Sequence, residues 1–120
     1  MVVREPSDET VDDVFHALSD ATRRDILRRS GQDRLSVSQL AGAYPMSFAA
    51  VQKHVAVLER AGLVSKERRG REQVVRSDPR AVTLARRALD GLEASWRDRV
   101  ERMAGLLAHT DETPTKGQKP

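Results

Sequence analysis

The side chains best able to do chemistry in this sequence are arginines, and their placement predicts contacts with phosphate. Residues 21–76 carry a net charge of +7, residues 1–20 carry −5, and residues 77–120 carry +1. The total of +3 over 120 residues therefore hides a basic middle segment. Such a concentration of positive charge is typical of surfaces that bind the nucleic-acid backbone, and a merely solvated basic face is the alternative.

Thiol, metal and hydrolytic chemistry have little support in the sequence. The chain has no cysteine, which excludes disulfides, thiolate nucleophiles and cysteine metal sites. His16 and His54 stand far apart, and His109 beside Asp111 and Glu112 is more often a solvated group than a zinc site. Without a Ser-His-Asp arrangement or a phosphate-binding glycine loop, we predict a protein that is not an enzyme and needs no metal or cofactor.

A segment that begins at Ser47 carries the residues best suited to read DNA bases. Val51, Val55 and Leu58 recur at i, i+4 and i+7, which predicts the buried face of a helix that ends near Gly62. The other face of its first turns then meets solvent, where glutamine can pair with adenine and lysine with guanine or phosphate. The candidate base readers are Ser47, Phe48, Ala49, Gln52 and Lys53.

The chain before Ser47 predicts the first half of a helix-turn-helix. A short helix capped by Ser36 or Ser38 must stop before Pro45, because the residue that precedes a proline is pushed out of the helical region. We expect both serines to join the DNA-binding set. Phe48 either touches thymine methyl groups or packs against Tyr44, and the sequence leaves both readings open.

A basic hairpin follows the second helix. Residues 63–68 and 71–76 predict two short strands around a tight turn that contains Gly70. Arginine at such a tip can follow the phosphate backbone or enter a narrow minor groove. The candidate DNA contacts at the tip are Arg68, Arg69 and Arg71.

The first and last helices predict an interface with a second copy of the chain. Apolar residues of the segment 11–18 share one helical face, and another apolar seam follows a helix that begins at Asp78-Pro79 and ends near Ala108. A helix of about 29 residues would span roughly 44 Å, more than a domain of this size can bury by itself. The expected dimer-interface residues are Val11, Val14, Phe15, Leu89, Leu92, Trp96, Val100, Met103 and Leu107.

These elements predict a mainly α winged helix-turn-helix, with four helices, a two-stranded hairpin and a long last helix. We expect residues 1–8 to be flexible, 9–108 to form the domain with its dimerisation helix, and 109–120 to be a disordered tail. The sequence shows no signal peptide and no membrane span, so a soluble cytoplasmic protein that does not contact membranes is the default expectation.

Four stretches of the sequence resemble the ArsR/SmtB family of bacterial winged-helix repressors. The first two are FHALSDATRRDIL at 15–27 and LSVSQLA at 35–41. The third runs from Ser47 to Val64 and contains the pairs AV, KH and VL and the sequence AGLV. The fourth begins with GRE at 70–72 and continues to Arg76 and Asp78-Pro79. The resemblance covers residues 8–107. It implies a DNA-binding repressor of transcription whose first and last helices build a symmetric dimer on an inverted-repeat operator of double-stranded DNA.

The sequence departs from the family at the thiolate metal site. Metal-sensing members carry Cys-x-Cys in the third helix, where this chain reads Ser36-Val37-Ser38. The resemblance therefore points to the subgroup that lacks this site, and it leaves the effector unknown. Two alternatives stay open: a ligand- or metal-responsive sensor with the same fold, and a protein-interaction module that does not bind DNA.

Overall fold

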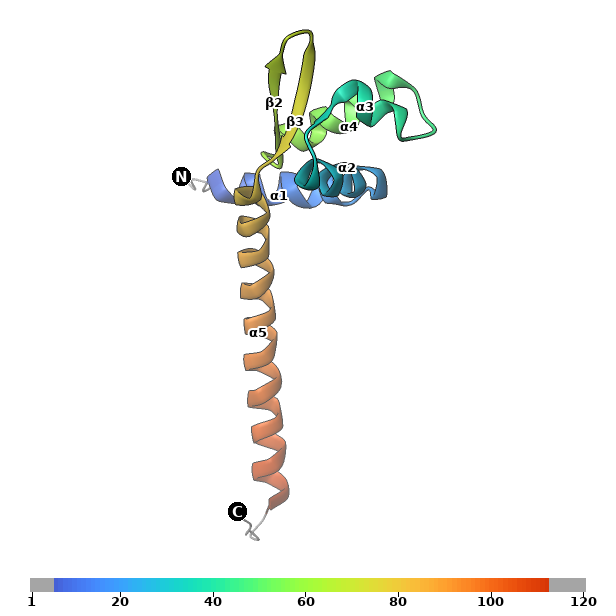
Figure 1. The fold of residues 1–120 in the computed structure, drawn as a ribbon. Helices are drawn as coiled ribbons and strands as arrows, with labels where there is room; N and C mark the ends of the chain where they lie inside the picture. Colours follow the sequence, from blue (N-terminus) through green and yellow to red (C-terminus); the bar gives the residue numbers. More distant parts are fainter. Residues whose placement is uncertain (1–5, 113–120) are drawn as a thin grey trace. The chain divides into compact units, whose positions relative to one another are not determined.

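The structure, a computed structural model, describes residues 6–112 (Figure 1). The chain divides into two units, residues 1–86 and 87–120, and the last helix begins in the first unit and continues through the second. No helix of the described residues is long and apolar enough to cross a membrane. The elements are α1 (Pro6–Leu18), α2 (Ala21–Gln32), β1 (Leu35–Ser36), α3 (Val37–Gly42), α4 (Phe48–Arg60), β2 (Val64–Arg69), β3 (Glu72–Ser77) and α5 (Pro79–Glu112).

Short polar residues begin three of the helices. The Asp20 carboxylate accepts a hydrogen bond from the Arg23 amide at 3.0 Å and caps α2, and this bond is the main reason that the pKa of Asp20 is lowered. The Ser47 hydroxyl caps α4 in the same way. At α3, Ser36 and Gln39 form a reciprocal capping box. These caps satisfy amide groups that have no partner inside their own helices.

Two arginines of α2 bond to the free carbonyl groups at the C-terminal end of α1. Arg23 donates from Nε to the Ala17 carbonyl at 2.8 Å and from Nη2 to the His16 carbonyl at 3.1 Å. Arg24 donates from Nη1 to the Leu18 carbonyl at 2.7 Å. The last carbonyls of a helix carry partial negative charge, so guanidinium groups are favourable partners there. These bonds fix the turn between α1 and α2.

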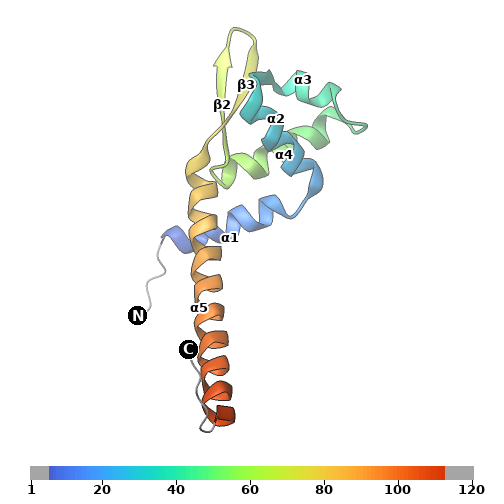
Figure 2. The same ribbon diagram turned by 60° about the horizontal axis from the view of Figure 1, so that its bottom comes forward.

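The sheet has one strand more than the sequence predicts. The strands lie in the order β1-β3-β2 and all pair antiparallel. In β1, Leu35 pairs with Val75 and Ser36 pairs with Val74. A strand of two residues is too short to show an alternating pattern, which is why the expectation of a two-stranded hairpin was incomplete. Figures 1 and 2 show the β2–β3 hairpin extending past the helices of the first unit.

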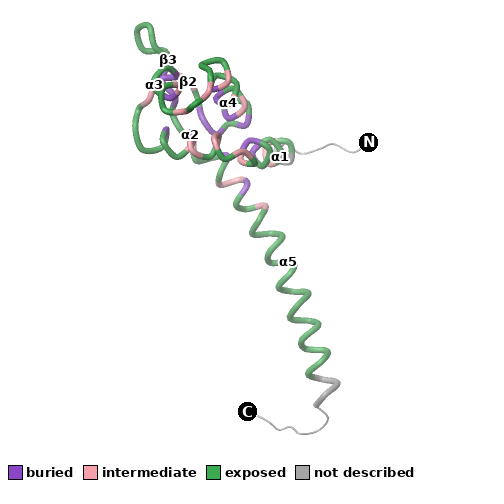
Figure 3. The backbone as a smooth tube through the Cα atoms, turned by 90° about the vertical axis from the view of Figure 1, so that its right-hand side faces the viewer, coloured by how far each residue is buried: buried purple, intermediate pink, exposed green. Residues whose placement is uncertain are grey.

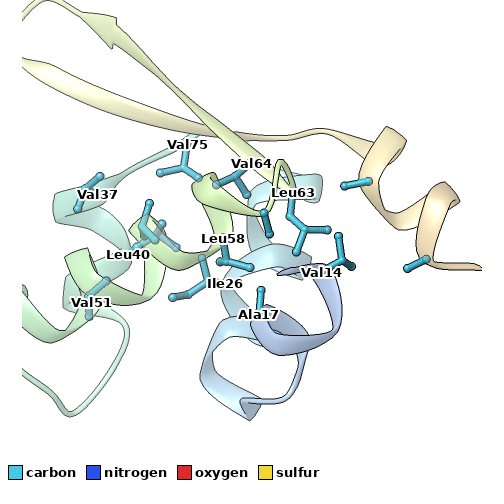
Figure 4. Packing of buried hydrophobic residues seen from close by; sticks show 14 residues of the cluster. Val14, Ala17, Ile26, Val37, Leu40, Val51, Leu58, Leu63, Val64 and Val75 are labelled. Carbon is cyan, nitrogen blue, oxygen red and sulfur yellow. The ribbon is translucent and has the colours of Figure 1, made fainter. Parts of the chain in front are cut away.

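The core of the first unit joins all of its helices to the sheet. Figure 4 shows its side chains, which come from α1, α2, α3, α4, the two longer strands and the start of α5. Val14 belongs to this core and is fully buried, so its expected place at a dimer interface was wrong. The apolar pattern of α1 correctly predicts an amphipathic helix, but it does not distinguish residues that face the chain's own core from residues that face a partner.

Two element ends differ from the expected boundaries. Helix α1 begins at Pro6, inside the segment 1–8 that we expected to be flexible, because proline suits the first position of a helix. Helix α5 continues to Glu112, four residues beyond the expected end at Ala108. Residues 1–5 and 113–120, where the rest of the expected flexible start and tail fall, lie outside the described residues.

Helix α5 carries a row of exposed apolar side chains in the second unit. From residue 87 to residue 108 every side chain except that of Ala88 is exposed (Figure 3). Trp96 is 62% exposed and Leu106 is 68% exposed. The other large apolar side chains on this stretch are Leu89, Leu92, Val100, Met103 and Leu107.

We predict opposite effects for alanine at two glycines. Gly62 follows the C-cap of α4 with φ +77°, so Gly62→Ala should lower the free energy of unfolding by about 1 kcal/mol, because side chains disfavour this region. Gly91 lies inside α5 with open space around it, and Gly91→Ala should raise the free energy of unfolding by about 0.5–1 kcal/mol.

Denaturant unfolding followed by circular dichroism measures both effects. A Gly62→Ala variant as stable as the wild type would contradict the assigned backbone conformation, since its added methyl group meets only the Ala81 side chain at 3.8 Å and causes no crowding.

Candidate nucleic-acid interface

The first turns of α4 present an exposed face of mixed chemistry. Phe48, Gln52 and Lys53 are all exposed, and Phe48 is 46% exposed. Val51 and Val55, on the other side of the helix, are buried, as the periodicity predicts. The exposed face of α4 therefore offers an aromatic ring, an amide and an ammonium group for contacts in a groove. Ser47 and Ala49 are exposed at the same end.

Helix α3 contributes less to this face than the sequence suggests. Ser36 is only 2% exposed, and its hydroxyl accepts the Gln39 amide at 3.0 Å. The expectation that Ser36 contacts DNA was wrong, because a buried hydroxyl that caps its own helix is not available to a ligand. Ser38, in the first turn of α3, is exposed and stays a candidate.

A polar cluster on α2 holds the turn between α3 and α4. The Tyr44 hydroxyl donates to the Asp25 carboxylate at 2.6 Å, and the Arg29 guanidinium donates to the same carboxylate at 2.7 Å. Arg29 also lies 5.5 Å from the centre of the Tyr44 ring. The cluster connects residues that are 19 positions apart in the chain, and it fixes the turn from which α4 begins.

The same contacts change the ionisation of these groups. Burial and the hydrogen bond to Asp25 raise the pKa of Tyr44 to about 12. The hydrogen bonds from Tyr44 and Arg29 lower the pKa of Asp25. At neutral pH the cluster therefore contains a carboxylate, a guanidinium and a neutral phenol, which are the forms that attract one another.

The wing is the basic tip of the β2–β3 hairpin, residues 68–72. Gly70 forms the turn with φ +63°, and Arg68, Arg69 and Arg71 are exposed around it. Arg69 Nε lies 3.7 Å from Glu67 Oε1, a distance at which an exposed ion pair contributes little. Within the described residues, the Arg71 side chain has no hydrogen bond or ion pair. The wing arginines can therefore turn to phosphate at small cost.

The wing is connected to α4 through its base. Lys66 Nζ lies 3.3 Å from Glu59 Oε1, which joins strand β2 to the second half of α4. Val64, the first residue of the same strand, and Leu63, directly before it, are buried in the core with Leu58. In Figures 1 and 2, α3 lies between the hairpin and the α3–α4 turn. The first unit thus carries both the exposed face of α4 and the arginines of the wing.

Sequence reasoning missed the residues that position this surface. The i, i+4 spacing of Asp25 and Arg29 is visible in the sequence, but the spacing does not reveal that Tyr44 joins them. Arg23, which bonds to α1 and lies 3.3 Å from His54 Nδ1, is likewise a long-range contact. His54, in the middle of α4, is half-buried. Among the described residues, no group of three or more His, Cys, Asp or Glu side chains could hold a metal ion.

Comparisons with known proteins place this arrangement among transcriptional regulators. No family model matches the chain. It is 38% identical over 79 residues to the HTH-type transcriptional regulator Rv2034 of Mycobacterium tuberculosis, a match that covers 66% of this chain and 74% of Rv2034. An ArsR-like transcriptional regulator from Rhodococcus sp. RHA1 has 31% identity and a TM-score of 0.71, with 92% of this chain and 100% of that chain covered.

A third relative supports the fold alone. The homodimeric winged helix-turn-helix DNA-binding domain Mb0332 of Mycobacterium bovis, a possible ArsR-family regulator, is 21% identical with a TM-score of 0.59, and 98% of this chain and 100% of that chain are covered. The named activity of all three relatives is regulatory, a class of function that is not enzymatic.

We predict that Tyr44 forms phenolate only near pH 12. Because its pKa is raised in the folded state, its contribution to stability is complete below about pH 10, the ordinary value for tyrosine, and is lost as the pH rises through 12. Tyr44 is the single tyrosine, so ultraviolet absorbance of phenolate reports it directly.

Two variants separate the cause. Asp25→Asn removes the charged acceptor and should move the titration midpoint down toward pH 10, whereas Asp33→Asn, at an exposed carboxylate after α2, should leave it in place. A wild-type midpoint near pH 10 would show that the Tyr44–Asp25 bond is absent in solution.

Proposed function

Because the chain belongs to the ArsR family of winged helix-turn-helix transcriptional regulators, we propose that it is a homodimeric repressor that binds an inverted-repeat operator without metal. The observation that carries the proposal is the pairing of α4, a capped helix with an exposed face, with a wing of exposed arginines on the same unit. Base contacts by the helix give sequence preference, and phosphate contacts by the wing give affinity.

In this proposal α4 is the recognition helix and enters the major groove. Gln52 pairs with adenine, and Lys53 donates to guanine or phosphate. Phe48, which is largely exposed, contacts thymine methyl groups. Ser38, Ser47 and Ala49 lie at the backbone and groove edge, and Arg68, Arg69 and Arg71 follow the phosphates or enter the minor groove beside it.

The dimer forms through the exposed apolar row of α5, together with Phe15 and Val11 of α1. Phe15 is 38% exposed and Val11 is half-buried. Apolar side chains in water cost about 25 cal/mol per Å² of exposed apolar area, so a continuous row of this size favours a partner. The Mb0332 domain is described as homodimeric, which supports the same assembly here. A two-fold dimer then binds two half-sites about 34 Å apart, which is an inverted repeat.

Repression is steric and metal-independent in this proposal. The positions that match the family's metal-binding cysteines are Ser36 and Ser38, and the chain has no cysteine to replace them. Ser36 is already committed to capping α3. A dimer seated on an operator that overlaps a promoter would exclude the polymerase by occupancy.

We predict separate effects for wing and helix variants on DNA binding. Arg69→Ala with Arg71→Ala should weaken binding to all sequences and reduce the slope of log affinity against log salt by about 2, one for each phosphate contact. Gln52→Ala should instead relax the preference at one base pair and cost about 1–3 kcal/mol on the preferred site. Arg99→Ala, which removes an exposed charge from α5, is the matched control.

The measurement is selection of bound fragments from random DNA, followed by fluorescence anisotropy with and without a chelator. If the wing double variant and the wild type bind DNA with equal affinity, the wing does not contact DNA. A loss of binding on adding the chelator would contradict the metal-free mechanism and favour the sensor alternative.

We predict that Leu92→Glu produces monomers, because the charge falls in the middle of the apolar row of α5. Leu92 is 52% exposed in the single chain and would be covered in the dimer. Ala94→Glu introduces the same charge at an exposed position off the row and should leave the dimer intact. Sedimentation velocity distinguishes the two, and a dimeric Leu92→Glu protein would remove α5 as the interface.

A further inference from the structure

Arg23 connects three segments of the first unit through one guanidinium group. Its Nε and Nη2 donate to the last carbonyls of α1, and its Nη1 lies 3.3 Å from Nδ1 of His54, in the middle of α4. Arg23 and His54 are both half-buried, and they are 31 positions apart in the chain. Within the described residues, this contact is the side-chain hydrogen bond that joins α2 to α4.

The chemistry of the pair fixes the proton on His54. A guanidinium group keeps all of its protons and can only donate, so Nδ1 of His54 must accept. An imidazole that accepts at Nδ1 is neutral and carries its proton on Nε2. A second proton on the ring would place an N–H group against the N–H group of Arg23, and the bond would be lost.

We propose that Arg23 is a positioning residue for the recognition helix, acting through His54, and that protonation of His54 releases α4 and weakens DNA binding. This rests on the proposed function. It adds a determinant that touches no DNA: α4 is held at its N-terminal end through the Tyr44 turn and at its middle through His54. Loss of the second attachment leaves α4 held by its buried apolar face and by the Tyr44 turn, without the polar contact that fixes its middle against α2.

The charged groups around His54 come from three elements. Arg23 faces it from α2, and the Asp20 carboxylate, the N-cap of α2, interacts with it electrostatically. Lys53 is its neighbour on α4, and Lys66 of β2 is paired with Glu59 farther along that helix. Helix α3 contributes no ionisable side chain, and α1 meets the cluster through the His16 carbonyl.

The pH dependence of DNA binding that we expect has the opposite sign to the one that simple electrostatics predicts. A positive charge added to a DNA-binding domain as the pH falls by itself strengthens binding. Release of α4 has the opposite effect. A fall in specific affinity between pH 7.5 and pH 5.5 at constant ionic strength is therefore the signature of the Arg23–His54 link.

The test compares the wild-type chain with four variants, each of which carries a single substitution. His54→Asn keeps an acceptor oxygen near the place of Nδ1 but cannot be protonated, so it should bind the selected operator like the wild type at pH 7.5 and lose the pH dependence. His54→Leu and Arg23→Gln break the link at every pH and should bind about tenfold more weakly at pH 7.5, the size expected for one hydrogen bond to a charged group. His16→Asn, at an exposed histidine of α1, should keep the wild-type pH profile.

Fluorescence anisotropy on the operator, with sedimentation to verify the dimer, measures these affinities. The proposal is overturned if His54→Leu binds as tightly as the wild type, or if wild type and His54→Asn gain affinity equally as the pH falls.

A measurement without DNA separates this proposal from the proposed function. In NMR spectra the His54 ring should show an accepting Nδ1 at neutral pH, and the amide signals of residues 48–53 should shift with pH in the wild type but not in His54→Asn. If no DNA is bound by the wild type, the repressor proposal fails while these spectra still decide the link. Amide signals of α4 that ignore both pH and the Arg23→Gln change would overturn the positioning role.

Discussion

The closure of helix ends by polar side chains is the interaction on which the rest of this structure depends. The helices of the first unit are too short to be stable alone, because the first turn of any helix fixes several residues for one hydrogen bond. Each therefore needs its free amides and carbonyls satisfied where it meets its neighbour. Asp20 and Ser47 do this at two helix starts, and Arg23 and Arg24 do it at the end of α1. The bonds of Arg23 and Arg24 also join α2 to α1, so they fix the turn between these two helices as well as closing a helix end.

The arginines of this protein are of two kinds, those that stabilise the fold and those that are available to bind DNA. The arginines of α2 are engaged in the fold: Arg23 and Arg24 bond to carbonyls, and Arg29 bonds to Asp25. The arginines of the wing have only long, exposed contacts, which solvent and salt screen strongly. A net charge counted along the sequence cannot separate the two kinds. Part of the +7 in residues 21–76 is therefore structural, and the surface available to phosphate is centred on the wing and the first turns of α4.

The sequence predicted the elements that have strong local signals. The Ser47 cap, the periodic apolar face of α4 and the glycine after it give α4 almost residue by residue, and the hairpin and the start of α5 follow from Gly70 and Asp78-Pro79. What it missed are contacts between segments distant in the chain. The strand β1 exists because Leu35 and Ser36 pair with β3, and the Tyr44–Asp25 bond exists because α3 and α4 fold back onto α2. Neither leaves a periodic trace, since pairing partners 19 to 40 positions apart impose no repeat on either segment.

The two mistaken site assignments have a common physical origin and narrow the candidate surface. Val14 lies on the side of α1 that packs into the core, and Ser36 lies directly before α3, where its buried hydroxyl caps that helix. On a helix of two to four turns, a rotation of about 100° per residue separates a buried position from an exposed neighbour, so composition alone assigns the wrong one easily. Phe15, next to Val14, is exposed, and Ser38, two residues after Ser36, is exposed as well. The surface that remains for DNA is formed by α4, the wing and Ser38 of α3. On α1, only the apolar residues outside the core, Phe15 and Val11, remain available to a second copy of the chain.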